Sequence, residues 1–321
     1  MKLTLAKPEH ARPISEFYNT VHGGSDFAHE ELFSAATVQQ LLRDGALEVL
    51  VASSDRNILG CGLGLPQQWN QSLEIGALSV SDAISERAKV GKALFEAIRR
   101  VGLQKYGLVI FRASSQASFR RARNIGAQCW GYWPRPGARS LQDAELLMGM
   151  FHEDGDTPRI TPPDNMLTRL PFAARLIDTY TRAEPGLPYP KNYPVGAPRG
   201  TGSPMISGRI WPTYHKRDNY ITIENIAGRY PLEIIRGFVD KVREKGVRDI
   251  RLTLPVNQDQ AFAELLDVGF KPVSYLPGWF LRGPYRYDCV EMVAGMPRLR
   301  STDENFAARA IRKINEGFAE P

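Results

Sequence analysis

The first third of the chain contains three stretches in which apolar and polar residues alternate. They are "LEVLVASS" (47–54), "NILGCGLGL" (57–65) and "SLEIGALSV" (72–80), and polar turns separate them. A period of two is typical of strands, so we expect three successive strands. Two amphipathic stretches, near 12–21 and 35–44, precede them and predict a pair of helices.

The period changes to that of a helix in the basic stretch "SERAKVGKALFEAIRR" (85–100). Leu94 and Ile98 are four residues apart on one apolar stripe, which predicts a helix over 89–105. A nearly continuous apolar run, "LVIFRAS" (108–114), follows it and indicates a buried strand.

The next residues predict a short helix and two closing strands. "QASFRRARNIG" (116–126) ends at a glycine, the residue favoured just after the last turn of a helix. "AQCWGYWP" and "ELLMGMF" then have the apolar content of strands, and a turn-rich segment joins them.

The same series of patterns occurs a second time. A shift of 143 residues places Gly126 on Gly269 and Pro134 on Pro277. Around these positions the chain again predicts strand, helix, strand, helix, strand and strand, from "NYITIENI" through "PLEIIRGFVDKVREKG" and "VRDIRLTLPV" to "DCVEMV". An ordered series at one spacing indicates two copies of a single α/β unit.

A polar, proline-rich stretch marks the expected boundary between the copies. "HEDGDTPRITPPD" (152–164) is predicted to link an N-terminal domain, 1–151, to a C-terminal domain, 165–321. Inside the second domain, residues 185–204 contain too many prolines and glycines for a helix or strand and predict a long loop. The tail, 305–318, predicts a helix that packs on its own protein, with a homodimer contact as its second use.

Composition narrows the class of protein. The 321 residues are 43% hydrophobic and 24% charged, and no apolar run approaches the roughly 20 residues of a membrane span, so we expect no membrane insertion. Cys61, Cys129 and Cys289 share no metal-binding spacing and the five histidines are scattered, which predicts a reduced, cytoplasmic protein without a metal. The net charge of +6 favours a polyanionic partner, but no block of five like charges marks a nucleic-acid arm.

The order of elements, with a glycine-bearing junction after the strand 72–80, resembles the GCN5-related N-acetyltransferase (GNAT) superfamily in a tandem arrangement. Members usually carry V-x-P-x-x-R-G-x-G-x-G between this strand and the next helix, followed by an apolar pair. Here Val80 ends the strand, Arg87 stands near the arginine position, and Gly91 fits the last glycine. Residues 94–95 fit the apolar pair. The resemblance implies two α/β domains in tandem, each with a mixed, mostly antiparallel sheet flanked by helices.

The resemblance also implies an acyl-CoA-dependent N-acyltransferase, most simply one that transfers acetyl from acetyl-CoA to an amine of a small molecule or peptide. The N-terminal domain would hold the donor, and the C-terminal domain would be a degenerate copy. A helix start leaves N–H groups unpaired and carries a positive partial charge, which suits a pyrophosphate. The residues expected to contact the donor are Leu78, Ser79, Val80, Arg87, Ala88, Lys89, Val90, Gly91, Lys92 and Ser115.

Transfer to an amine requires a base, donors for the thioester oxygen and a proton for the leaving thiolate. Glu74 lies six residues before Val80, where several amine-acetylating members carry a glutamate base, and strict alternation would place it on the same face as Leu78 and Val80. Backbone N–H groups from Leu78 to Val80 would bind the thioester oxygen, as in the family. The tyrosine that often serves as the acid is replaced by Ala122, so Tyr132, a tyrosine of the second copy or the departing ammonium would supply the proton.

Two other functions remain open. Ala88 and Lys89 stand where the family usually has glycine, and the junction is one residue longer than usual. These departures and the basic charge also fit tandem transferases of this fold that take an aminoacyl group from tRNA, and tRNA would then be a partner. The leading hypothesis requires no nucleic acid. The other hypothesis is a non-catalytic ligand-binding protein with the same fold.

Overall fold

The chain forms two compact units. The computed structural model describes residues 1–23, 27, 29–54, 57–67, 70–134, 141–151, 159–160, 210–216, 219–226, 232–247, 249–256, 259–282, 285–295 and 305–315. The first unit contains Met1–Phe111 and residues 149–151, and the second contains Arg112–Met148 and the described residues from 159 onward. Each unit is described by itself below.

Five neighbouring strands lie at the centre of the first unit. Their order is β1 (Lys2–Leu5), β2 (Glu48–Ser54), β3 (Asn57–Gln67), β4 (Ser72–Val80) and β5 (Leu108–Ala113). Neighbouring strands from β1 to β4 are antiparallel, and β4 and β5 are parallel. The three predicted strands are confirmed. No strand was predicted at β1, because a four-residue edge strand with mostly exposed side chains is too short to show a period.

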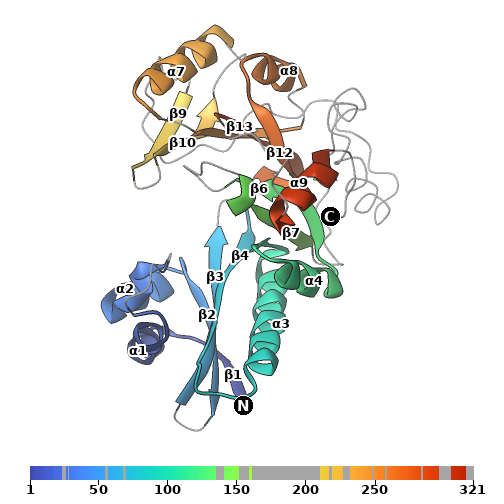
Figure 1. Ribbon diagram of the computed structural model, residues 1–321. Coiled ribbons are helices and arrows are strands. Elements are labelled where there is room, and N and C mark those ends of the chain that lie inside the picture. Colours follow the sequence, from blue (N-terminus) through green and yellow to red (C-terminus); the bar gives the residue numbers. More distant parts are fainter. Residues whose placement is uncertain are drawn as a thin grey trace. The chain divides into compact units, whose positions relative to one another are not determined.

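Helices cover both faces of this sheet. Figure 1 shows α1 (Ala11–His22) and α2 (Ala35–Arg43) on one face and α3 (Arg87–Tyr106) on the other. Two short 3₁₀ turns, η1 (Pro8–His10) and η2 (Glu30–Phe33), flank α1. The three helices were predicted to within two residues at each end.

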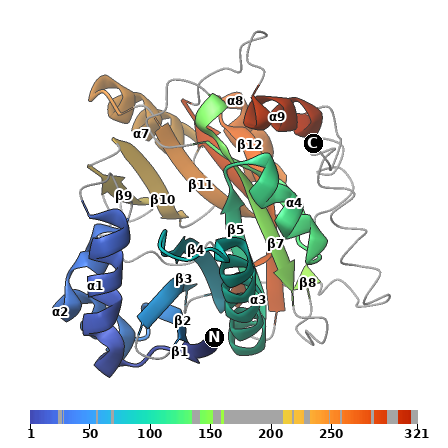
Figure 2. The same cartoon turned by 60° about the horizontal axis from the view of Figure 1, so that its bottom comes forward.

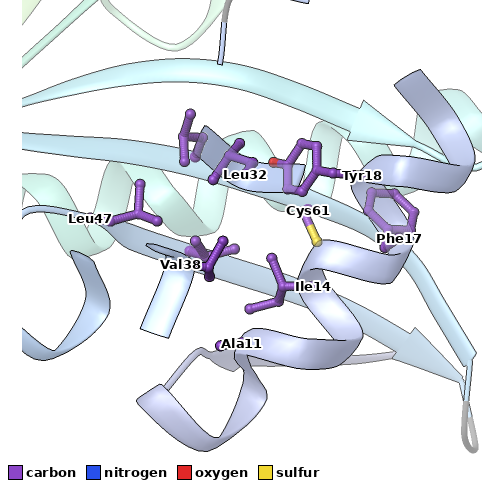
Figure 3. Packing of buried hydrophobic residues seen from close by; sticks show 10 residues of the cluster. Ala11, Ile14, Phe17, Tyr18, Leu32, Val38, Leu47 and Cys61 are labelled. Atoms are coloured by element: carbon purple, nitrogen blue, oxygen red, sulfur yellow. The ribbon is translucent and has the colours of Figure 1, made fainter. Parts of the chain in front are cut away.

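The core between α1, α2 and the sheet is a continuous apolar cluster. Figure 3 shows Ile14, Phe17 and Tyr18 of α1 beside Leu32 and Cys61. All five side chains are buried. Burying an aliphatic or aromatic side chain of this size stabilises the fold by about 1.5–3 kcal/mol, so this cluster fixes α1 on the sheet.

On the opposite face, β3 has glycines at every second position, and α3 packs directly against them. A Cβ atom at Gly60 would lie 2.9 Å from Leu94 Cδ1, and one at Gly62 would lie 3.1 Å from Leu78 Cδ2. A Cβ at Gly60 would also lie 2.8 Å from the Ser79 carbonyl oxygen, so a side chain at either glycine would require its neighbours to shift. The "GCGLG" stretch of β3 therefore allows the helix that follows β4 to approach the sheet closely.

The second unit is also a mixed sheet with helices (Figure 2). Its strands follow the order β7, β6, β12, β13, β11, β10, β9, and β8 pairs in parallel with β13. The strands are β6 (Gln128–Trp133), β7 (Glu145–Phe151), β8 (Arg159–Ile160), β9 (Ile210–His215), β10 (Tyr220–Ile226), β11 (Asp249–Pro255), β12 (Lys271–Arg282) and β13 (Tyr285–Ala294). The helices are α4 (Gln116–Asn124), η3 (Leu141–Asp143), α7 (Leu232–Glu244), α8 (Asp259–Asp267) and α9 (Phe306–Asn315). The α/β fold class with mixed, mostly antiparallel sheets is confirmed.

The two predicted copies share the same backbone conformation at the end of their short helix. At the end of α4, Gly126 has φ +89° and its N–H donates to the Arg123 carbonyl, 3.0 Å away. At the end of α8, Gly269 has φ +92° and its N–H donates to the Leu266 carbonyl, also at 3.0 Å. A left-handed residue in this position favours glycine. The same cap at the same spacing shows that the α4–β6–β7 segment occurs again as α8–β12–β13.

The next-to-last strands of the two copies, β6 and β12, meet within the second unit. β6 and β12 are antiparallel and pair at Gly131 and Ser274. The Ser274 hydroxyl donates to the Tyr132 carbonyl at 2.9 Å. Gly131 has φ +134°, and a Cβ there would lie 2.3 Å from the Val273 carbonyl oxygen. The strands therefore touch backbone to backbone at a position that only glycine can occupy.

Several expectations about domain organisation stay predictions. The division into 1–151 and 165–321 differs from the two compact units, whose boundaries fall inside β5 and β7. Most of the expected linker, 152–164, lies outside the described residues, as does the whole loop 185–204. The predicted tail helix is present as α9, and it packs against β6 and η3.

Candidate functional site

The C-terminal half of β4 departs from regular strand geometry. Gly62 of β3 pairs with Leu78, whereas Gly64, two residues further along β3, pairs with Ile75, three residues back along β4. β4 therefore contains one extra residue, a β-bulge at positions 76–77. A bulge bends the strand and moves every later side chain to the other face.

This bulge corrects the expectation that Glu74, Leu78 and Val80 share a face. Leu73 contacts the Cβ position of Gly102 on α3, and Leu78 contacts that of Gly62, beside α3. Both leucines therefore face α3, although they are five positions apart and an odd spacing in a regular strand would place them on opposite faces. Glu74 follows Leu73 and so points to the face of α1. Glu74 therefore does not share a face with Leu78 and Val80, and this argument for its catalytic role is lost. The role itself stays a prediction.

The bulge also marks the point where β4 loses its second neighbour. β4 pairs with β5 from Ser72 to Ile75, opposite Leu108–Phe111. Among the described residues of the first unit, residues 76–80 of β4 pair with β3 alone. A strand edge of this kind suits a ligand that carries amides, which would bind as an added strand.

A helix start lies immediately after this open edge. α3 begins at Arg87, and its N-cap residue, Glu86, makes no side-chain cap. The N–H groups of Lys89 and Val90 donate to the Glu86 carbonyl, which leaves the N–H groups of Arg87 and Ala88 as the donors of the helix start. Gly91, expected to contact the donor, lies inside the helix. Its Cβ position would meet only Val80 Cγ2, at 3.8 Å.

The cations around this helix start are paired with carboxylates. Arg87 contacts Asp82 at 2.6 Å and Lys89 contacts Glu86 at 3.3 Å. Lys92 contacts its own-helix neighbour Glu96 at 3.8 Å. These side chains are all exposed, and exposed pairs of this kind contribute about 0–1 kcal/mol. An incoming phosphate would therefore displace the carboxylates at little cost.

A hydrogen-bonded group occupies the other face of β4. His22 Nε2, at the end of α1, lies 2.8 Å from Ser79 Oγ. Tyr18, one turn earlier on α1, is fully buried. Burial raises the pKa of the Tyr18 phenol well above its usual range, an effect that Cys61 adds to and Ser79 opposes. Burial also lowers the pKa of His22, and the Asp82 carboxylate opposes that shift.

Two of the predicted site residues belong to the second unit. Ser115 is the N-cap of α4, where its hydroxyl accepts a hydrogen bond from the Ser118 N–H at 3.2 Å. Tyr132 lies on β6 with only 2% of its surface exposed. The other predicted residues, in β4 and α3, are brought together in the first unit.

The structure adds His22 and Tyr18 to the residues near β4. No sequence pattern selects them, because α1 is remote from β4 along the chain and a lone histidine forms no motif. The only available signal was the apolar stripe of α1, which places residues four apart on one face.

The second copy has the same bulge. β10 pairs in parallel with β11 from Tyr220 to Ile223, and its register with β9 shifts by one residue directly after Ile223. The junction between β10 and α7 lies outside the described residues, so the expectation of a shorter, degenerate junction there stays a prediction.

The described residues contain no group of three or more His, Cys, Asp or Glu side chains placed to hold a metal ion. Cys61, Cys129 and Cys289 are all buried. In the same part of the chain, no helix is long and apolar enough to cross a membrane.

Comparison with known proteins found similarity only to solved structures, since no family model and no curated protein matches the chain. The aminoglycoside 6'-N-acetyltransferase from Enterococcus faecium is 14% identical over 51% of this chain and 100% of that chain, with a TM-score of 0.38. The ribosomal-protein-alanine N-acetyltransferase from Brucella melitensis is 21% identical over 47% and 99%, also with a TM-score of 0.38. An aminoglycoside 6'-N-acetyltransferase complexed with coenzyme A is 13% identical over 51% and 100%, with a TM-score of 0.35. At these values the likeness adds nothing to what the chain's own residues indicate.

Proposed function

We propose that this protein is a GNAT-type N-acyltransferase that takes an acyl group, most simply acetyl, from coenzyme A. The observation that carries the proposal is the junction in the first unit, where a bulged strand with an open edge leads into an uncapped, basic helix start. Each part suits one part of the donor. The N–H groups of Arg87 and Ala88 suit the pyrophosphate, and the β4 edge suits the amides of the pantetheine arm.

The basic side chains near the helix start would bind the diphosphate in place of the carboxylates that they now contact. Arg87, Lys89 and Lys92 each have an exposed carboxylate beside them, so binding a phosphate exchanges one weak ion pair for a charge-assisted contact. Salt should weaken donor binding for the same reason. Ser115, the N-cap of α4 in the second unit, stays a sequence-based candidate for donor binding.

The chemistry needed at β4 is modest. Backbone N–H groups at residues 78–80 would stabilise the negative charge that forms on the thioester oxygen. The amine attacks the carbonyl carbon, the C–N bond forms, the C–S bond breaks, and the proton lost by nitrogen passes to the thiolate. Glu74 and Tyr132 remain the sequence-based candidates for the proton transfers, although Tyr132 is buried. The acceptor is an amine of a small molecule or peptide.

Calorimetry tests the donor first. Titration with acetyl-CoA and with CoA should give saturable heat, and no heat at about millimolar ligand would refute the proposal. Thiol release would then be followed with acetyl-CoA and an acceptor panel of kanamycin and an alanine-initiated peptide, the two classes named for the similar structures. A gel shift with bulk tRNA at two salt concentrations tests the aminoacyl-transfer alternative, and we expect no shift.

A further inference from the structure

Arg251 of β11 and Glu291 of β13 are charged residues in the interior of the second unit. The two strands are antiparallel neighbours, and Arg251 pairs with Val293, two residues from Glu291, so both side chains lie on one face of the sheet. Arg251 is 2% exposed and Glu291 is 4% exposed. Because a buried charge is costly unless a partner compensates it, the state of this pair depends on its contacts.

Arg251 joins the two copies of the repeat. Its Nη2 atom donates a hydrogen bond to the Pro134 carbonyl, at the end of β6 in the first copy. Its guanidinium lies over the Trp133 ring, 4.6 Å from the ring centroid, and Arg112 lies over the same ring at 4.5 Å. In the second copy, the Tyr220 ring centroid is 5.4 Å from the Arg251 guanidinium. The guanidinium is therefore held between aromatic rings from both copies.

The two carboxylates beside Arg251 lie just outside hydrogen-bonding distance. Glu291 Oε1 is 3.8 Å from Nη1 of Arg251, and Asp249 Oδ2 is 3.8 Å from Nη2. Nη1 of Arg251 and Oε2 of Glu291 are buried and have no hydrogen-bond partner among the described residues. A movement of about 1 Å would bring Nη1 and the Glu291 carboxylate to the roughly 2.7–2.9 Å of a charge-assisted hydrogen bond.

We propose that Arg251 and Glu291 form a proton-controlled switch inside the second unit. With the Glu291 carboxyl protonated, Nη1 of Arg251 stays apart from it, and Arg251 keeps its contacts with Trp133 and the Pro134 carbonyl. Release of that proton to solvent leaves a buried carboxylate, which draws Nη1 into a direct ion pair. The guanidinium then moves relative to the Trp133 ring, so proton release at one copy changes the contact between the two copies.

The surrounding groups place this change near neutral pH. Burial raises the pKa of Glu291 to about 7, an effect that Arg251 and Arg112 oppose. Burial also lowers the pKa of Arg251, but a guanidinium stays charged throughout this range. Glu291 is therefore the member of the pair that changes its charge between about pH 5 and pH 9.

The other groups that face the pair come from three neighbouring strands. Asp249 lies on the same strand as Arg251, and Tyr220 lies on β10. From β12, the residue that pairs with Glu291 is Ser274, whose hydroxyl does not titrate in this range.

Crystal structures of the full chain at about pH 5.5 and about pH 8.5 test the movement directly. We expect the distance between Nη1 of Arg251 and the nearer Glu291 oxygen to remain close to 3.8 Å at the lower pH. At the higher pH it should shorten to about 2.7–2.9 Å. Equal distances at the two pH values overturn the proposal.

Tryptophan fluorescence follows the same change in solution. The chain has five tryptophans, so the signal of Trp133 is the difference between each protein and the same protein with Trp133→Phe. In the wild type, we expect this difference to change in one step with a midpoint near pH 7.

Two carboxylate variants show whether Glu291 causes the step. Glu291→Gln, whose amide keeps the shape of the protonated carboxyl, should remove it. Glu244→Gln, at the exposed end of α7, is the control and should keep it. A step that persists in Glu291→Gln, or a wild type without a step, contradicts the switch.

Discussion

Two substitutions of Gly91 separate the effect of a negative charge near the helix start from the effect of added side-chain volume. Its Cβ position meets only one atom, Val80 Cγ2 at 3.8 Å. Gly91→Ala should therefore leave both the fold and acetyl-CoA affinity nearly unchanged. Gly91→Glu should lower that affinity by about 10-fold or more, because a carboxylate beside the diphosphate repels it. Calorimetry measures both, and equal affinities for the two variants would place the donor elsewhere.

A second residue-scale prediction concerns Glu291 of β13, which lies within a buried charged group. Its carboxylate is 3.8 Å from the Arg251 guanidinium, which contacts the faces of Trp133 and Tyr220. Burial raises the pKa of Glu291 to about 7, an effect that Arg251 and Arg112 oppose. Between pH 4.5 and 7 the folded protein therefore holds a proton that the unfolded chain has released.

The free energy of unfolding should fall as pH rises through that window, by up to about 3 kcal/mol from this group. Urea unfolding at several pH values should show a flatter dependence for Glu291→Gln than for the wild type. Glu244→Gln, at the exposed end of α7, should keep the wild-type dependence. An unchanged slope in Glu291→Gln would mean that Glu291 is ionised throughout.

At the scale of elements, the docking of α3 depends on positions without side chains. A Cβ at Gly102 would lie 2.5 Å from Val109 Cγ2 and 2.8 Å from Leu73 Cδ2. Gly102→Ala should destabilise the protein by about 1–3 kcal/mol, because a packed interface must shift to admit the methyl group. Gly237→Ala in α7, where nothing lies within 4 Å, should instead stabilise it by about 0.5–1 kcal/mol. Thermal unfolding of the two variants gives the comparison.

The sequence predicted elements well and their faces less well. Periodicity located β2, β3, β4 and α3 because each has a covered face, and the repeat showed which elements recur. The bulge in β4 leaves no mark in the hydrophobic pattern, since Ile75, Gly76 and Ala77 fit a regular strand equally well. The face of Glu74 was therefore predicted wrongly. The contact of His22 with Ser79 joins residues from different elements, and only tertiary packing brings them together.

For the molecule as a whole, the stability of the second unit should depend strongly on the close contact between β6 and β12. Gly131→Ala places a methyl group 2.3 Å from a carbonyl oxygen and forces alanine into φ +134°. We expect a loss of roughly 2–4 kcal/mol in unfolding free energy. Ser274→Ala, which removes only the hydroxyl that donates to Tyr132, should cost about 1 kcal/mol. Equal losses for the two variants would show that the backbone contact carries no special constraint.

The pairing of Gly131 with Ser274 has a consequence for symmetry. The shift that relates the two copies converts residue 131 into residue 274, so this pair joins a position to its own counterpart. In an antiparallel pair such a meeting point lies on a local two-fold axis. Two identical chains would have to place the same residue on both sides of that axis. A single chain is free of this requirement. Here one strand contributes Gly131, which has no side chain, and the other contributes Ser274, whose hydroxyl group forms a hydrogen bond across the pair.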